Sequence, residues 1–132
     1  MVSRGRLWDV ADMPGFVVDG AEGWVSYGTY RIKDGECELA ILDSPFARRG
    51  GGSAVIEAIV AAARAAGCRR VWLVTTNDNV DALAFYQLRG FRLAALHRAA
   101  VTEARETLKP EIPEVARNGI PIRDELELEL EL

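Results

Sequence analysis

Residues that build disulfide frameworks or metal sites are scarce in this sequence. Of its 132 residues only one is histidine and two are cysteines, Cys37 and Cys68. Neither cysteine belongs to a CxxC motif or to a Cys/His cluster with metal-ligand spacing. This scarcity argues against a metal site and against a secreted fold held by disulfides, so we expect a cytoplasmic protein without a metal.

Long hydrophobic runs and an excess of positive charge are also lacking. No segment approaches the roughly 20 apolar residues that cross a bilayer, and the start MVSRGRLWDVADM lacks the apolar run of a signal peptide. The chain carries 16 lysines and arginines against 20 aspartates and glutamates, a net charge of −4. General nucleic-acid binding needs a basic footprint. We therefore expect neither a membrane nor a nucleic acid as partner, while small molecules and cationic acceptors stay open.

The composition is that of a folded domain, with 49% hydrophobic and 27% charged residues. No repeat or linker divides the chain, so we expect one domain over residues 1–132. The first third predicts an antiparallel meander of three strands. These are FVV at 16–18, WVSYGTYRI at 24–32 and CELAIL at 37–42, separated by the turn sequences DGAEG and KDGE.

The middle of the chain alternates helices with strands. Apolar residues recur on one helical face over 53–66, and Gly67 stands where a helix C-cap is expected. VWLVT at 71–75 predicts a strand buried on both faces. TNDN then supplies capping residues for a second helix over about 80–88, and a strand follows over 91–97.

An irregular connection with three prolines and an alternating tail close the chain. Glu and Leu alternate strictly over 125–132, which places every leucine on one face of a strand. We interpret the glutamates as a solvated face rather than a metal or acid–base site. The predicted order β-β-β-α-β-α-β-β indicates an α/β or α+β fold with a mixed sheet.

Three consecutive glycines, Gly50 to Gly52, stand at a strand-to-helix junction. Glycines permit close approach of the backbone, and the unpaired amides and dipole of a helix N-terminus favour a phosphate or pyrophosphate. Arg48 and Arg49 add charge beside them, although a flexible turn would also explain the glycines. A P-loop is excluded because no lysine precedes Ser53, and VWLVTTN lacks the acidic residue of a dinucleotide fingerprint.

The loop resembles the acyl-coenzyme A loop of the GNAT superfamily of N-acyltransferases, whose motif is Gln/Arg-x-x-Gly-x-Gly/Ala. In the register 47–52 both motif glycines match, but Ala47 stands where the family has Gln or Arg. The register 49–54 also satisfies the pattern but places Glu57 on the apolar helical face. We prefer the first register and leave the second open.

A second signature supports the same resemblance. In NDNVDALAFYQLRGF, 77–91, Asn79 precedes a helix that carries Phe85 and Tyr86, and Gly90 and Phe91 open the next strand, as in the family. The resemblance covers about 24–97 and implies a mostly antiparallel mixed sheet with splayed central strands and flanking helices. It implies acetyl-coenzyme A as co-substrate and no metal.

The resemblance also assigns roles to particular residues. The coenzyme would contact Asn79 and the loop from Arg48 to Ser53, including Gly51. A backbone N–H near Leu39, Ala40 and Ile41 would face the oxyanion.

Two further residues would carry the proton transfers of the reaction. Tyr86 would be the general acid, since a phenol with an ordinary pKa near 10 is matched to a thiolate leaving group. The alternative is a core tyrosine beside Phe85. Glu38 matches the position of the general base in some members, with Glu36 on the same face of the strand, and a solvated strand carboxylate is an equal alternative for both. His97 has no partner nearby in sequence and is read as structural or exposed.

The N-terminus departs from the family, whose members usually begin with a strand and two helices that wall the acceptor site. Only about fifteen residues precede FVV here, so those helices are expected to be shortened or missing. A second copy in a homodimer, or the connection over 99–122, could complete the pocket. The leading hypothesis is an N-acetyltransferase acting on a small-molecule or protein amine. The alternatives are a catalytically silent acyl-coenzyme A sensor or assembly module, and a nucleotide-phosphate binder.

Overall fold

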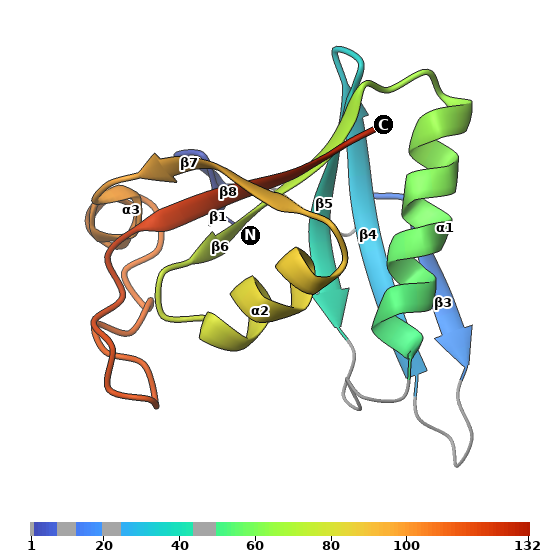
Figure 1. Ribbon diagram of the computed structural model, residues 1–132. Helices are drawn as coiled ribbons and strands as arrows, with labels where there is room; N and C mark the ends of the chain where they lie inside the picture. Colours follow the sequence, from blue (N-terminus) through green and yellow to red (C-terminus); the bar gives the residue numbers. More distant parts are fainter. Residues whose placement is uncertain (1, 8–12, 20–24, 44–49) are drawn as a thin grey trace. The chain divides into compact units, whose positions relative to one another are not determined.

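The computed structural model describes residues 2–7, 13–19, 25–43 and 50–132, and these hold eight strands and three helices (Figure 1). The chain divides into two compact units, which we treat separately. The α1 unit comprises residues 9–72 and 130–132, and the α2 unit comprises residues 1–8 and 73–129. The hydrogen-bonded strand order of the main sheet is β3-β4-β5-β6-β8-β7.

The α1 unit contains the predicted meander. Strands β3 (Gly15–Asp19), β4 (Val25–Lys33) and β5 (Glu36–Asp43) are paired antiparallel in that order. The β4–β5 turn is Asp34-Gly35, with both φ angles positive at 54° and 75°, which is the backbone of a two-residue hairpin turn. Strand β6 (Arg70–Thr76) then pairs parallel to β5, with Glu36 opposite Arg70 and Glu38 opposite Trp72.

Helix α1 (Gly51–Ala65) packs against all three strands of the meander. Its buried residues include the predicted apolar face: Val55, Ile56, Ile59, Val60 and Ala63. The predicted glycine ends it, because Gly67 has a φ of 77° and the amides after the cap return to the last turn. The Gly67 amide donates to Arg64 O and the Cys68 amide to Ala63 O, the paired bonds of a Schellman motif.

At Gly28 on β4 the sheet lies close against helix α1. A Cβ added there would lie 2.7 Å from Val55 Cγ1, 3.1 Å from the Ile41 carbonyl oxygen and 3.3 Å from Ile59 Cδ1. Real Cβ atoms essentially never lie at the first of these separations, so a larger residue forces Val55 or the backbone around it to shift.

We therefore expect Gly28→Ala to lower the free energy of unfolding by about 1–3 kcal/mol, the usual cost of overpacking a dense core. Urea unfolding of the purified variant measures this loss. Glu57→Ala, at an exposed position of α1, is the control and should change stability little. A Gly28→Ala protein as stable as the control would contradict the close packing of α1 on β4.

The α2 unit holds the remaining elements, which are helix α2 (Val80–Leu88), strand β7 (Arg92–His97), helix α3 (Ala100–Thr107), strand β8 (Glu125–Glu131) and the hairpin β1 (Val2–Ser3) and β2 (Arg6–Leu7). Strands β7 and β8 pair antiparallel. The unit's buried residues include Tyr86, Phe91, Val101, Ala104 and Leu128. The predicted strands and helices of this half are confirmed.

Two elements of the α2 unit were not predicted. Helix α3 lies within the connection expected to be irregular, and it begins after Ala99, whose φ of 62° turns the chain into the helix. Tertiary bonds hold it there: the Ala99 amide donates to Asp124 Oδ1 at 2.7 Å. The Arg105 guanidinium donates to the carbonyls of Ile112, Pro113 and Ile122. The hairpin β1–β2 is the other addition.

The solvated glutamate face predicted for the tail is wrong for its first two glutamates. Glu125 is only 5% exposed and Glu127 only 6%. Glu125 Oε1 accepts a hydrogen bond from the Arg4 amide at 3.2 Å, and Glu127 Oε1 lies 3.1 Å from His97 Nε2. Strict alternation predicted the strand correctly. The face that carries these glutamates is not solvated, however, because the β1–β2 turn and strand β7 supply partners to them.

Within the described ranges no helix is long and apolar enough to cross a membrane.

Candidate active site

The start of α1 is the described part of the glycine loop. Gly50 is the N-cap residue with a φ of 81°, a left-handed conformation that favours glycine. Its carbonyl accepts the first helical bond, from the Ala54 amide at 3.0 Å. The described residues place no side-chain cap on this end, and the first turn carries no acidic residue. The amides of Gly51 and Gly52 thus have no acceptor within the helix, which favours an anion there.

The loop residues that precede Gly50 lie outside the described ranges. They include Arg48 and Arg49, expected to contact the coenzyme, and Ala47, where the motif departs from the family. Ser53 lies in the first turn of α1 and is half-buried.

Strand β5 has an irregularity at the predicted oxyanion position. Tyr30 pairs with Leu39, but the preceding Thr29 pairs with Ile41, so Ala40 is an extra residue on β5. Such a bulge interrupts the ladder and leaves the extra residue without a partner across it. The three backbone positions predicted to supply the N–H donor therefore coincide with a local break in the pairing of β4 with β5.

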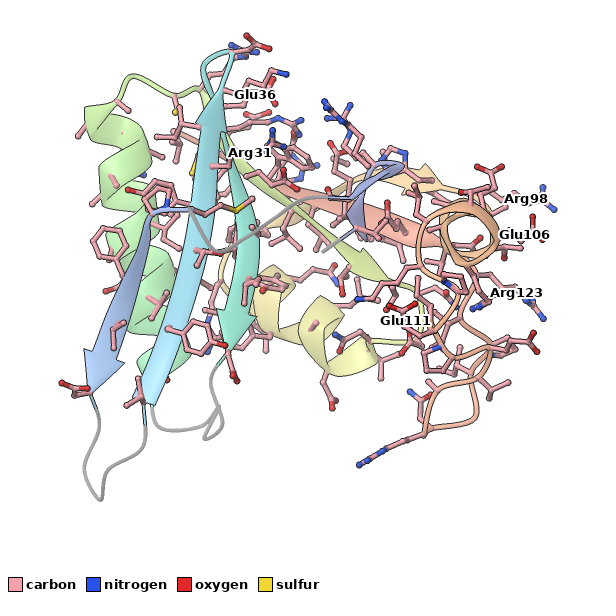
Figure 2. All side chains as sticks on the ribbon, turned by 180° about the vertical axis from the view of Figure 1, so that it is seen from behind. Arg31, Glu36, Arg98, Glu106, Glu111 and Arg123 are labelled. Carbon is pink, nitrogen blue, oxygen red and sulfur yellow. The ribbon has the colours of Figure 1, made fainter. Side chains whose placement is uncertain are left out.

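Glu38 is buried against an arginine that the sequence reasoning missed. Glu38 is 1% exposed, and Arg31 Nη2 donates to its Oε1 at 2.5 Å. Figure 2 labels this arginine on β4. Asp34-Gly35 is a two-residue hairpin turn, and counting outward from it pairs Arg31 with Glu38. The DG turn in the sequence was thus the signal that could have found this pair.

Glu36, the alternative base, is held by two arginines. Arg69 Nη2 donates to Glu36 Oε2 at 2.7 Å and Arg70 Nε to Oε1 at 2.6 Å. Burial alone would raise the pKa of Glu36, but the hydrogen bonds and charges of Arg70 and Arg69 outweigh it and lower the pKa below its usual value. A carboxylate bound in this way is a poor proton acceptor.

Helix α2 carries the other predicted residues of the site. Asn79 is its N-cap, and Asn79 Oδ1 accepts a hydrogen bond from the Ala82 amide at 3.2 Å. Tyr86 is 9% exposed and makes edge-to-face contacts with Phe85 and Phe91 at ring-centroid distances of 5.3 and 5.5 Å. Burial raises the pKa of Tyr86 to about 12, so the phenol keeps its proton at neutral pH.

The two cysteines are buried. Burial, with contributions from Cys68 and Glu38, raises the pKa of Cys37 to about 12. Since the thiolate is the reactive form, Cys37 is not a nucleophile at neutral pH. The described part of the chain holds no group of His, Cys, Asp and Glu suited to a metal ion.

His97 has a partner that sequence proximity did not reveal. Its Nε2 lies 3.1 Å from Glu127 Oε1, and Arg4 Nε approaches the same oxygen at 3.8 Å. The pairing is a consequence of the β7–β8 ladder, in which His97 lies opposite Glu125 and on the same side as Glu127. No local signal in the sequence connects residues 30 apart.

Asn77 organises the end of β6 in the α2 unit. Its Nδ2 donates to the Pro121 carbonyl at 2.9 Å, and its Oδ1 accepts from the amides of Arg123 and Asp124 at 2.9 and 3.0 Å. These bonds hold the segment before β8 against the chain that leads into α2. A cleft of about 420 Å³ lies between these two segments of the chain. It is lined by residues 78–81, 116–118 and 122.

The predicted residues thus fall into two groups. Glu38, the bulge and the start of α1 belong to the α1 unit, whereas Asn79 and Tyr86 share one helix of the α2 unit. The roles that the resemblance assigns to these residues stay predictions.

The comparison with known families reaches the same class. The acetyltransferase (GNAT) family model matches residues 6–91, more than half of the chain. This protein therefore belongs to the GNAT family of acetyltransferases.

Relatives of known sequence and structure extend this finding. The chain is similar to the uncharacterized protein YdhI of Bacillus subtilis, with 52% identity over 98 residues that cover 74% of this chain and 61% of YdhI. It is 49% identical to the uncharacterized protein YxbD of the same organism, over all of this chain and 83% of YxbD. The chain thus spans about three fifths and five sixths of these two proteins.

The fold is similar to that of a Bacillus subtilis acetyltransferase crystallised in complex with CoA. The TM-score is 0.73 at 19% identity, covering 89% of this chain and 76% of the other. At this identity the similarity concerns the fold alone. The mixed, mostly antiparallel six-stranded sheet with three helices among the described residues is thereby confirmed as a GNAT-like fold.

Proposed function

We propose that this protein transfers an acetyl group from acetyl-CoA to a primary amine of a small molecule or protein. The observation that carries the proposal is the start of α1, where the amides of Gly51 and Gly52 follow the left-handed N-cap Gly50 and no described side chain caps them, in a chain of the GNAT family. When bound, acetyl-CoA would supply the acetyl group as an activated thioester.

The start of α1 fits the diphosphate of the coenzyme. The amides of Gly51 and Gly52 and the positive end of the helix dipole offer hydrogen bonds and partial positive charge. An acidic residue in the first turn would oppose an anion, and there is none. We assign Arg48, Arg49, Ser53 and Asn79 to the same ligand on the strength of the resemblance.

Tyr86 is our candidate for the general acid. A phenol whose pKa is raised to about 12 stays protonated across the working range, although burial also makes it a weaker acid toward a leaving thiolate than an ordinary phenol. The surrounding rings of Phe85 and Phe91 fix its orientation. The break in the ladder at Ala40 supports a backbone donor in this part of β5 for charge developing on the acyl oxygen.

The base is the least supported role. Glu38 stays our candidate by position, but it would have to give up its attraction to Arg31 on accepting a proton. If Glu38 stays paired with Arg31 during the reaction, solvent water would remove the proton of the amine instead. A Glu38→Gln substitution separates these two possibilities, as developed in the Discussion.

The coenzyme site can be tested without knowing the acceptor. We expect CoA to raise the melting temperature of this protein more than ATP does, since only ligands that bind the folded state stabilise it. Gly50→Asn and Gly50→Asp form a matched pair, because both accept the left-handed backbone while only Asp adds a charge. Gly50→Asp should lose most of the shift that Gly50→Asn retains.

The outcomes separate the competing functions. A larger rise of the melting temperature with ATP than with CoA would favour a nucleotide-phosphate binder. Equal rises with CoA in the two Gly50 variants would show that the start of α1 is not part of the coenzyme site. Thiol release from acetyl-CoA with a panel of amines then tests turnover. Tight CoA binding without thiol release would identify a sensor rather than an enzyme.

A further inference from the structure

Helix α2 has little packing to hold its first turn in place. Of its nine residues Tyr86 alone is buried, and residues 79–81 are exposed. The ring contacts of Tyr86 with Phe85 and Phe91 hold the C-terminal end of the helix. The position of its N-terminal end, which carries Asn79, must therefore come from contacts of the turn that precedes it.

Asn77 supplies such contacts through both ends of its side-chain amide. Its Oδ1 accepts from the amides of Arg123 and Asp124 at 2.9 and 3.0 Å, which uses both lone pairs of the oxygen. Its Nδ2 donates to the Pro121 carbonyl at 2.9 Å, and its main-chain amide donates to the Asp124 carbonyl at 3.0 Å. Asn77 is thus bonded through side chain and main chain to the segment that leads into β8.

The turn between Asn77 and α2 is bonded at two further points. The Asn79 amide donates to the Thr76 carbonyl at 3.1 Å, which closes the turn. Asn118 Nδ2 donates to the Asp78 carbonyl at 2.9 Å. The turn is therefore held both internally and against residues some 40 positions later, so its orientation sets the direction in which α2 begins.

An amide suits position 77 because it accepts and donates hydrogen bonds at once. A carboxylate of the same shape could accept from the two main-chain amides but could not donate to the Pro121 carbonyl. Loss of these bonds should displace Asn79, two residues away, much more than Tyr86, which ring packing holds at the other end of the helix. The two ends of α2 thus depend on different contacts.

We propose that Asn77 is a positioning residue for the coenzyme: it sets the start of α2 and thereby places the Asn79 side chain. This inference rests on the proposed acetyltransferase function, in which Asn79 contacts the coenzyme and Tyr86 protonates the leaving thiolate. Asn77 acts through the turn and not on the substrates. Its removal should therefore weaken coenzyme binding and leave the proton transfer by Tyr86 largely intact.

The kinetics of two Asn77 variants of the full chain test the inference. We expect Asn77→Ala and Asn77→Asp to raise the KM for acetyl-CoA, and the Kd of CoA measured by calorimetry, by about tenfold, the scale of one lost hydrogen bond. The kcat per folded molecule should change little. A merely structural role would lower stability and leave the KM of the folded fraction unchanged, so the split between KM and kcat distinguishes the two roles.

Asp124→Ala is the matched control from the same segment. Asp124 Oδ1 accepts from the Ala99 amide at 2.7 Å at the start of α3, and the main-chain groups of Asp124 stay available to Asn77. This variant should lose stability and keep the coenzyme affinity. An equal loss of affinity in Asp124→Ala would overturn the inference. So would a loss in Asn77→Asp without one in Asn77→Ala, because the added charge alone would then explain it.

Asn118→Ala keeps the test decisive if Asn77→Ala does not fold. It removes only the exposed bond to the Asp78 carbonyl and should weaken CoA binding in the same direction by a smaller factor. Unchanged CoA affinity in Asn118→Ala, with no folded Asn77→Ala protein, would overturn the inference.

Backbone amide chemical shifts separate this inference from the function on which it rests. In Asn77→Ala we expect the largest changes over residues 78–83 and small ones over 85–91. That pattern, in a wild-type protein that binds CoA without releasing thiol from acetyl-CoA, would support the role of Asn77 and refute the enzyme. Acetyl transfer with the same KM for acetyl-CoA in wild type and Asn77→Ala would leave the acetyltransferase standing and refute the positioning role.

Discussion

Tyr86→Phe is expected to lower kcat by about 100-fold or more, the usual contribution of a positioned general acid. The substitution removes one oxygen atom and preserves the ring contacts with Phe85 and Phe91. Binding of CoA should therefore persist, and the melting-temperature shift with CoA is its measure. The kinetic assay measures thiol release from acetyl-CoA in the presence of an amine that the wild-type protein acetylates.

The pH dependence gives Tyr86 a second signature. Because its pKa is raised from 10.0 to about 12 in the folded protein, ionisation of this phenol should not limit activity at any pH below about 11. The same shift contributes stability that is fully present below pH 10 and is lost between pH 10 and 12, where the unfolded chain ionises first. Alkaline unfolding of Tyr86→Phe should lack that loss.

Phe85→Leu is the control for the ring packing, since it alters the neighbouring aromatic contact and leaves the phenol in place. It should reduce stability and retain most of the activity per folded molecule. Undiminished turnover in Tyr86→Phe would show that Tyr86 is only a core tyrosine, the alternative that the sequence also allowed.

Glu38→Gln is expected to lower the free energy of unfolding by about 3 kcal/mol, the scale on which a buried ion pair loses one partner. The substitution leaves the Arg31 guanidinium, with a side chain only 22% exposed, beside a neutral amide. Urea unfolding measures the loss. The Arg31→Met/Glu38→Leu double variant should recover much of it, because an apolar pair of similar volume replaces both charges.

The same variant decides whether Glu38 is also the base. A base would show a large fall in kcat/KM for Glu38→Gln at a temperature where the variant is fully folded. Glu36→Gln is the matched control from the same strand. The Glu36 side chain is 23% exposed, against 2% for that of Glu38, so we expect a loss below about 1 kcal/mol. Full stability in Glu38→Gln would contradict the ion pair as a source of stability.

Local patterns predicted most of the elements that carry the candidate site. Gly67 was read correctly as the end of α1 because a left-handed residue after a helix requires glycine. Asn79 was read correctly as a possible cap because its side chain reaches only its own helix. The roles proposed for Tyr86, Glu38 and the glycine loop came from the family resemblance, and they stay predictions.

Other features depended on contacts that no local pattern contains. The Arg31–Glu38 pair is an intermediate case: it is not a local pattern, but the hairpin register fixes it once the turn is known. Helix α3 and its Arg105 bonds depend on carbonyls 7 to 17 residues away. The cleft depends on Asn118 reaching Asp78, 40 residues earlier.

Local patterns in the sequence were enough to predict most of the strands and helices and several of their ends, because these follow from periodicity and turn residues within a few positions. They did not predict helix α3 or the β1–β2 hairpin, and the family was inferred from the resemblance of two motifs. The tertiary structure decided which charges are buried. Glu125 and Glu127 alternate with leucines, as residues on a solvent-exposed face of a strand would. Yet Glu125 bonds to Arg4 in the β1–β2 turn, and Glu127 pairs with His97 on β7. A strand's periodicity states which residues share a face, whereas burial depends on what folds onto that face.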